Sequence, residues 1–364
     1  MKLKEITDCL ENFAPLAYQE SYDNSGLICG NYNMEITAAL ICIDSTEEVI
    51  DEAITKGCNL VIAHHPIVFS GMKKFNAKNY VERTIIKAIK NDIAIYAAHT
   101  NLDNVYNGVS AKIAEKLGLS NCSVLLPKSN LLKKLIVFCP EEAAERVRTA
   151  LFSVGAGNIG NYDECSFNSK GTGTFRAGKR SNPHVGEIGK QHHEKEVKIE
   201  TIYPAFIESR LLKALFISHP YEEVAYDIIP LANENNRIGS GVLGELSEEM
   251  DSMEFLHYLK KKMTADGIRY TSLTPKKIRK VALCGGSGSF LLEEAIKRGA
   301  DIFVTADFKY HQFFDAEKRI IIADIGHYES EQYTVELFYE ILKKNFNTFA
   351  LLISSINTNP INYL

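Results

Sequence analysis

Two adjacent histidines follow a run of apolar residues, at a place where a buried strand would stop. His64 and His65 come directly after residues 60–63 and are followed by Pro66. In open α/β sheets, ligands gather at the carboxyl ends of strands, so this pair stands where a metal site would form. Because neighbouring side chains of a strand point to opposite faces, both imidazoles can serve one site only if the backbone leaves the strand there. Otherwise each addresses a different metal ion, or both are ordinary loop histidines.

A second strand end and a later helix offer further metal-capable side chains. The apolar run at residues 93–98 ends in His99, and Asp103 follows four positions later. The Asp103 carboxylate could bridge two cations, whereas His99 could be a ligand or, more simply, a group that orients one. His327 and Glu331 lie one turn apart if a helix begins near residue 327, which is a common way to offer two ligands to one centre. Alone, this pair would be interpreted as a capping segment whose acidic residues suit the helix dipole.

Together these side chains predict a dinuclear metal site. The predicted ligands are His64, His65, Asp103, His327 and Glu331. Two metal ions that share carboxylates need about this many protein ligands, with water filling the remaining positions. Nitrogen and oxygen donors suit several divalent ions and do not select among them. We expect two divalent ions per chain, zinc or iron first, with manganese or nickel as alternatives.

A glycine-rich segment could bind an anion near the metals. It comprises Gly285, Gly286, Ser287 and Gly288, and it lies between a predicted strand and a predicted helix. Backbone amides at a helix N-terminus attract phosphate or carboxylate, so this segment could hold a nucleotide or another small phosphorylated ligand. It lacks the Lys-Ser/Thr pair of a Walker loop, and a tight strand-to-helix turn explains it equally well.

One more predicted strand end carries a carboxylate. Asp307 lies just beyond the predicted strand at residues 301–305, and His311 follows one helical turn later. Both could line the same cleft, although Asp307 could equally cap the next helix. We predict that His99, Asp307 and His311 transfer protons in a reaction at the site.

The elements that would position these residues alternate between strand and helix. In the first third, strands are predicted at residues 38–43, 60–63 and 93–98, with helices at 79–90 and 109–117. In the last third, strands are predicted at 280–283, 301–305, 320–324 and 348–353, with helices at 290–297, 308–318 and 331–344. Alternation at this pace is typical of βαβ units around a buried sheet. The α/β class is therefore expected, with two related lobes at residues 1–130 and 232–364 that form one core.

The middle of the chain departs from this pattern and predicts an inserted αβ domain at residues 131–231. Residues 155–189 are rich in glycine, serine and asparagine. The charged segment at residues 190–196 is predicted to be a solvated loop.

Bulk properties limit the classes of function. Hydrophobic residues make up 45% of the 364 residues and charged residues 24%, as in globular proteins of two or three domains. The net charge of -5 leaves no basic excess to neutralise phosphates, so nucleic acid is an improbable partner. The apolar runs have strand length and cannot cross a membrane. The eight cysteines form no C-x-x-C pair, and the N-terminus has no apolar signal core, so we expect a cytoplasmic protein.

Several motifs resemble those of the YbgI/YqfO family, whose members are named GTP cyclohydrolase 1 type 2 homologs. They are Ser-Tyr-Asp-Asn-Ser-Gly-Leu at residues 21–27, His64-His65-Pro66, residues 99–103, residues 219–223, residues 285–288, and His327-x-x-x-Glu331. The sequence departs from the family pattern at Tyr22, where tryptophan is usual, and at Ala306-Asp307, where Gly-Asp is usual. It also has Tyr310-His311 in place of two histidines.

The resemblance implies a two-lobed αβ core with a dinuclear metal site between the lobes. It also implies an inserted domain similar to PII and CutA-type proteins, and assembly into a hexameric ring with an internal cavity. The family's metal ligands carry over onto the same five residues that the strand ends select. The leading hypothesis is a metal-dependent hydrolase that opens a purine ring, as the family name suggests. The alternative is a ring-shaped metal-binding adaptor or regulatory protein without enzymatic activity.

Overall fold

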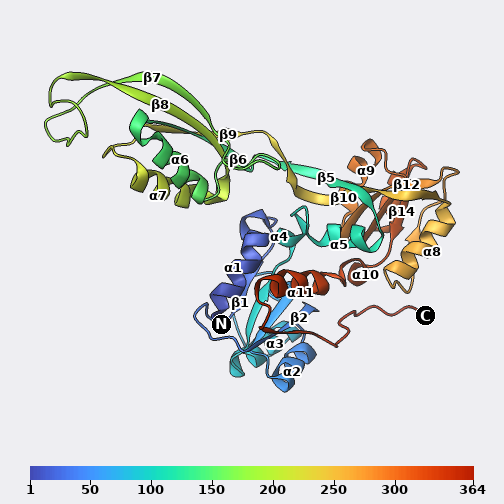
Figure 1. Cartoon of the computed structure of the whole chain (residues 1–364). Helices are drawn as coiled ribbons and strands as arrows, with labels where there is room; N and C mark the ends of the chain where they lie inside the picture. Colours follow the sequence, from blue (N-terminus) through green and yellow to red (C-terminus); the bar gives the residue numbers. More distant parts are fainter. The chain divides into compact units, whose positions relative to one another are not determined.

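Three β-sheets organise the chain, and the computed structural model describes every residue from 1 to 364. The residues group into two units: Met1–Pro127 and Asn236–Leu364 form the first, and Lys128–Asn235 form the second (Figure 1). Two of the sheets belong to the first unit, and the expected α/β class is confirmed. None of the helices is long and apolar enough to span a bilayer.

The first sheet has the strand order β1-β4-β3-β2-β15, with four parallel strands and β1 antiparallel at one edge. Its strands are β1 (Gly26–Cys29), β2 (Ala38–Asp44), β3 (Leu60–His65), β4 (Ala94–Ala97) and β15 (Ala350–Ile353). Nearly every side chain of β2, β3 and β4 is buried, as expected for parallel strands covered on both faces.

Four helices cover this sheet. They are α1 (Leu3–Phe13), α2 (Glu47–Lys56), α3 (Tyr80–Lys90) and α11 (Thr334–Asn345). α1 and α11 pack on one face, where Tyr96 and Phe338 are among the largest buried side chains. α2 and α3 pack on the other face, which the alternate residues of the same strands line. The sheet is therefore held rigidly, and the carboxyl ends of its strands have fixed positions.

The second sheet has the order β11-β14-β13-β12-β10-β5, and its three central strands β14, β13 and β12 are parallel. Its strands are β5 (Ser120–Ser129), β10 (Glu234–Met250), β11 (Arg269–Tyr270), β12 (Ile278–Ser287), β13 (Ile302–Ala306) and β14 (Ile321–Asp324). One face is covered by α5 (Val109–Lys116) and α8 (Ser252–Lys262), and the other by α9 (Leu292–Lys297).

The two sheets exchange segments of the chain. β15 and α11 come from the end of the chain but join the first sheet, whereas α5 and β5 precede residue 130 but join the second. The lobes therefore differ from the predicted ranges 1–130 and 232–364, because local alternation does not specify which sheet a strand joins. The helix predicted at residues 331–344 is α11, which begins three residues later than predicted, and Glu331 belongs to the separate short helix α10 (His327–Glu331).

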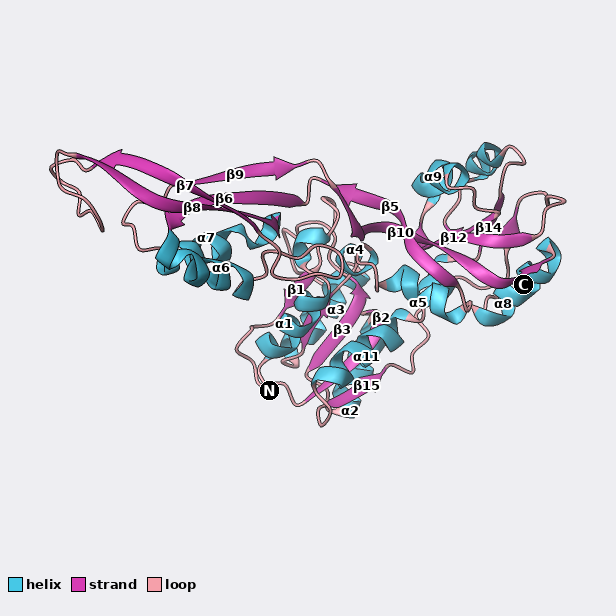
Figure 2. Cartoon of the chain, turned by 45° about the horizontal axis from the view of Figure 1, so that its top comes forward, coloured by secondary structure: helices cyan, strands magenta, loops and turns pink.

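The second unit, which overlaps the predicted insert at residues 131–231, has a four-stranded antiparallel sheet with the order β7-β8-β6-β9. Its elements are β6 (Leu132–Pro140), α6 (Ala144–Ser153), β7 (Phe167–Arg176), β8 (Gln191–Pro204), α7 (Glu208–Ser218) and β9 (Tyr226–Leu231). Both helices lie on one face of the sheet (Figure 2). This β-α-β-β-α-β connectivity is ferredoxin-like. The closer likeness to PII and CutA-type proteins stays a prediction.

The prediction that residues 190–196 form a solvated loop is wrong. Residues 191–196 begin β8, which pairs with β7 as far as the Arg176–Gln191 pair. Their charged side chains are exposed or half-buried on a two-stranded ribbon, so polar composition and strand structure coexist there. Solvation of the side chains does not require an unpaired backbone.

Candidate metal centre

The ends of two neighbouring strands in the first sheet carry the first group of histidines. His64 and His65 are the last two residues of β3, and His99 comes just after β4 and directly before the short helix α4 (Thr100–Asp103). The ring centroids of His64 and His65 are 4.9 Å apart, and each is 5.3 Å from that of His99. The adjacent imidazoles therefore reach one site without the backbone leaving the strand between them.

The second group comes from α10, whose first and last residues are His327 and Glu331. Glu331 Oε2 lies 2.9 Å from His65 Nε2 and 3.1 Å from His327 Nε2, and these two nitrogens are 3.3 Å apart. His64 Nε2 lies 3.7 Å from Glu331 Oε2 and 3.7 Å from Asp103 Oδ1. The five side chains predicted as metal ligands thus lie in one cluster.

Each histidine of the cluster is oriented by an oxygen acceptor behind it. The Nδ1 of His64 donates to the Ala98 carbonyl (2.9 Å), and that of His65 donates to Asp44 (2.7 Å). The Nδ1 of His99 donates to Asp23 (2.8 Å), and that of His327 donates to Asp307 (2.6 Å). Carbonyl and carboxylate oxygens only accept hydrogen bonds, so the proton of each neutral ring is on Nδ1. The Nε2 lone pairs are then directed toward the cluster, as in histidines that bind metals.

The electrostatics of the cluster favour a cation. Burial opposes a charged imidazole, but the Asp44 and Glu331 carboxylates on either side of the ring outweigh it and raise the pKa of His65 to about 10. Burial likewise opposes charge on His327, yet Glu331 and Asp307 raise its pKa to about 11. Burial and the nearby Glu331 carboxylate raise the pKa of Asp103 to about 7. Without a metal ion, protons supply the positive charge that this site requires.

The residues present fit a divalent metal ion. His64 Nε2 and Asp103 Oδ1 are buried and have no hydrogen-bond partner. Such atoms cost free energy unless something satisfies them, and native structures contain few of them. The ligand atoms of His64, His65 and His99 lie within 4.8 Å of one another, as do those of His65, His327 and Glu331. Imidazole and carboxylate donors in two such groups are the ligand types that first-row divalent metals prefer.

Comparison with known proteins places the chain in a family. The family model Duf34/NIF3 (NGG1p interacting factor 3) matches residues 1–360. The chain belongs to the Duf34/NIF3 family. A relative from Bacillus subtilis named "GTP cyclohydrolase 1 type 2 homolog" is 39% identical over 99% of this chain and 98% of its own length. A relative of the same name from Halalkalibacterium halodurans is 40% identical over the same shares.

Solved structures of Duf34/NIF3 relatives have the same fold. A crystal structure of a Bacillus cereus protein related to NIF3 superposes with a TM-score of 0.86, at 39% identity, covering 100% of this chain and 99% of that one. A Staphylococcus aureus structure gives a TM-score of 0.80 at 30% identity, again covering 100% and 99%. The resemblance inferred from the motifs is thus confirmed.

The glycine-rich segment has a different role from the predicted anion cradle. It continues β12, and the amides of Gly285 and Gly286 donate to the hydroxyls of Ser110 (3.4 Å) and Ser330 (2.9 Å). Gly286 has a φ of +61°, and a Cβ atom there would come within 2.2 Å of Glu331 Oε1. The glycines therefore allow α10 to approach the strand. Their two bonded amides are not available to a phosphate.

Of the three residues predicted to transfer protons, His99 alone borders the site cavity. Asp307 lies behind His327 as the acceptor of its Nδ1 proton. His311 is exposed and packs against Tyr310 and Phe314, away from the cluster. Residues 310–316 form a 3-10 helix that begins after Asp307, so the predicted α-helical spacing between positions 307 and 311 does not exist.

Sequence reasoning missed the two carboxylates that hold the first-sheet histidines. Asp44 ends β2, beside His65 in the parallel register, and the strand-end rule applied to that strand would have found it. Asp23 lies in the loop before β1, where no periodic signal exists. It also accepts bonds from the backbone amide and the hydroxyl of Thr100, so it orders the turn that carries His99.

The cluster opens into a cavity of about 420 Å³. Its walls include His65, His99, Asp103, His327 and Glu331. No lysine or arginine lines it. A volume of this size accommodates a small organic molecule.

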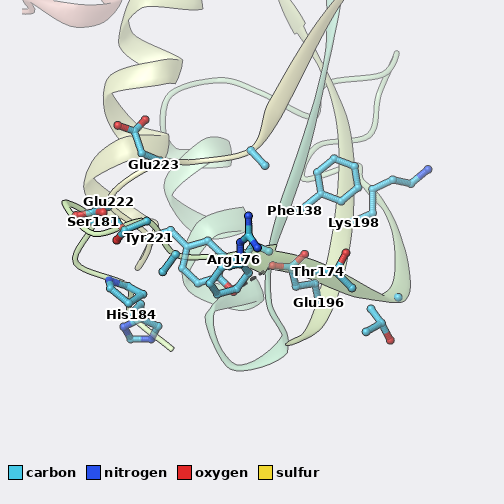
Figure 3. A pocket seen from close by; sticks show the side chains of 18 of the residues that line it. Phe138, Thr174, Arg176, Ser181, His184, Glu196, Lys198, Tyr221, Glu222 and Glu223 are labelled. Atoms are coloured by element: carbon cyan, nitrogen blue, oxygen red, sulfur yellow. Dashed lines mark hydrogen bonds between the residues drawn. The ribbon is translucent and has the colours of Figure 1, made fainter. Parts of the chain in front are cut away.

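The second unit has a separate cavity of about 710 Å³. Phe138 and Lys198 lie on one side of it and His184 on the other, while the Tyr221 hydroxyl donates to Glu196 at 3.0 Å (Figure 3). None of its residues belongs to a cluster that could hold a metal ion. The candidate metal centre is therefore confined to the first unit.

Proposed function

We propose that the chain is a metal-dependent hydrolase that binds two divalent ions, zinc or iron first, through His64, His65, Asp103, His327 and Glu331. The observation that carries this proposal is the convergence of imidazole nitrogens on the buried Glu331 carboxylate, beside two buried polar atoms that lack any partner. When bound, such ions lower the pKa of water and stabilise negative charge that develops on the substrate.

The chain's own residues supply orientation and proton transfer. Asp44 and Asp307 fix the rings of His65 and His327, and this support keeps the ligands in place as protons leave and enter the site. His99 donates its Nδ1 proton to Asp23, so its Nε2 is left to face the cavity. We assign His99 to accept a proton from water or to return one to the leaving nitrogen.

The reaction class we propose is hydrolysis of a carbon–nitrogen bond in a purine-like ring. The curated relatives bear the name "GTP cyclohydrolase 1 type 2 homolog", and this name supports the class without fixing the substrate. Water adds to the ring carbon, the carbon–nitrogen bond breaks, and the ring nitrogen takes up a proton. The cavity of about 420 Å³ supports a ring-sized substrate.

Metal analysis followed by an activity screen tests the proposal. The purified protein should contain about two divalent ions per chain, and metal-loaded protein should open a purine ring or cleave a phosphoester. His65→Ala should lose metal and activity together, whereas His257→Ala, an exposed histidine outside the site, should keep both. If loaded protein leaves GTP, guanosine and a broad panel of phosphoesters unchanged, just as His65→Ala does, the hydrolase proposal should be abandoned.

A non-enzymatic adaptor is the second candidate, and the separate core of the second unit favours it. Replacing residues 128–235 with a short hairpin loop discriminates between the two. A hydrolase should keep metal and some turnover of small substrates, whereas an adaptor should keep metal and lose its partner.

We also propose a cytoplasmic homo-oligomer, with a hexamer as the expected state. Large exposed aromatic side chains such as Tyr162 (76% exposed) and Phe167 (67% exposed) support self-association. Light scattering of the purified protein should give about six chains per particle, and a monomer would contradict this proposal.

A further inference from the structure

Three large aromatic side chains border the metal cavity while remaining exposed to solvent. Tyr22 is 70% exposed, Phe69 is 53% exposed and Phe290 is 63% exposed, and all three line the cavity. They come from separate segments: the loop before β1, the loop after β3, and the 3-10 helix Ser289–Leu291 after β12. Phe69 also meets the ring of His99 edge-on, with 5.8 Å between centroids. We call these three residues the aromatic collar.

Exposed rings at the edge of a cavity need an explanation. Single exposed aromatic residues are common on protein surfaces, but several around one concave site mark a place where an apolar or flat ligand is bound. Aromatic rings attract other flat rings by stacking or by edge-to-face contact. The aromatic collar is therefore suited to a planar ring system that enters the cavity.

The charge of the cavity points to the same class of ligand. Five carboxylates of the cluster line the cavity or hold the histidines from behind: Asp23, Asp44, Asp103, Asp307 and Glu331. No lysine or arginine lines the cavity to offset them. Two divalent ions bring a charge of +4, so the loaded site keeps a net charge of about −1 with neutral histidines. A polyphosphate would enter against this field.

We propose that the substrate of this site is a flat, uncharged heteroaromatic ring, in the form of a base or nucleoside, and that the site discriminates against the nucleoside triphosphate. This inference rests on the proposed hydrolase function and specifies its substrate class. The aromatic collar holds the ring, and the acidic interior disfavours phosphate groups.

The sequence provides a convenient reporter for the test. The chain contains no tryptophan, so Tyr22→Trp introduces a single tryptophan in the aromatic collar. We would titrate this variant with guanosine and with GTP, which share one base, and follow tryptophan emission in metal-free and metal-loaded protein. Guanosine should bind at least 10-fold more tightly than GTP at low ionic strength. Added salt should narrow this ratio, because it screens charge and leaves stacking intact.

Calorimetric titration of guanosine into the otherwise native chain tests the aromatic collar itself. Phe69→Ala and Phe290→Ala should each weaken binding about 10-fold, the size expected for loss of one stacked ring. Phe290→Leu, which stays apolar, should be weakened nearly as much. Phe314→Ala removes a similarly exposed ring outside the cavity and should bind guanosine normally.

Two results would overturn the inference. One is GTP binding as tightly as guanosine or more tightly at low salt. The other is collar variants that bind guanosine as well as Phe314→Ala does. Metal content measured on the same samples separates this failure from failure of the proposed function. Protein that holds its metals but ignores guanosine contradicts the substrate class alone, whereas protein that binds no metal contradicts the hydrolase proposal.

Discussion

Metal binding to this chain should release protons, and their number follows from the environment of the ligands. A histidine or carboxylate must be deprotonated at the ligating atom before it binds a metal ion. In the metal-free protein, the pKa of His65 is about 10 and that of His327 is about 11, because each ring lies between two carboxylates whose attraction outweighs the cost of burial. Both rings are therefore protonated at pH 7, and metal ions must displace both protons.

Asp103 adds a third, partial contribution. Its pKa is raised to about 7 by burial and by the Glu331 carboxylate, so about half of the molecules hold a proton there at pH 7. The expected release is about two and a half protons per chain at pH 7, about three at pH 5 and about two at pH 9. Since each released proton adds one power of ten per pH unit, the apparent metal affinity should rise roughly 300-fold per unit near pH 7.

Titration calorimetry in buffers of different ionisation enthalpy measures this number directly. The observed enthalpy is plotted against the buffer enthalpy, and the slope gives the protons released. Asp103→Asn removes the carboxyl that is half protonated at pH 7. For the metal that this variant still binds, the slope at pH 7 should fall to about two. A slope below one for the native chain would refute the reasoning, because it would mean that the histidines are neutral before metal arrives.

The same shifts predict the pH dependence of the metal-free protein. A histidine whose pKa is higher in the folded state than in the unfolded state stabilises the fold. This stabilisation is complete when the pH is below the unfolded pKa of about 6.5. This contribution from His65 and His327 is lost as the pH rises through about 10 and 11. The metal-free protein should thus lose stability on the alkaline side, and metal binding should remove that loss.

Three substitutions test the remaining parts of the site. Gly286→Ala should destabilise the fold by about 1–2 kcal/mol and also abolish metal binding, because its Cβ would displace Glu331. Gly57 has a similar φ of +68° with open space around it, so Gly57→Ala should destabilise the fold through the backbone strain alone. Asp307→Ala should weaken metal binding about 10- to 100-fold in a chelator competition, with little change in thermal stability. Asp103→Asn should raise the metal-free stability by about 2–4 kcal/mol at pH 8 and by almost nothing at pH 4, because the carboxylate is costly only when ionised; equal unfolding curves at pH 8 would contradict this.

Strand ends carried most of the information that sequence reasoning could use. His64, His65 and Asp103 are near the ends of apolar runs, and the rule that ligands gather there needs no knowledge of the third dimension. Asp44 satisfies the same rule at the end of β2, and only its partner His65 reveals its role. Local patterns failed where spacing depended on helix type, as for His311, which a 3-10 helix turns away from the cluster.

Long-range packing decided what local patterns left open. A glycine-rich turn after a strand is compatible with an anion cradle or with close packing, and the choice at Gly286 depends on Glu331, which is 45 positions later in the chain. Which sheet a strand joins is likewise decided by contacts between residues far apart in the sequence. Residues 350–353 look like the natural continuation of the last lobe, yet they pair with β2 in the first sheet.

This return of the chain end has a consequence for the metal centre. After β15, Ser354 and Ser355 bond to Glu52, and Thr358 then donates to the second oxygen of Asp44 at 2.6 Å. The Asp44 carboxylate, which orients His65, is thereby held by residues near the end of the chain. Asn359, the residue after Thr358, donates to Glu329 of α10 at 3.0 Å. The terminal segment therefore links β2, whose Asp44 orients His65, to α10, which carries His327. The metal ligands come from both lobes, and the segment after β15 holds the two groups of ligands together. This segment follows the last lobe in the sequence, but its strand β15 pairs with the first sheet.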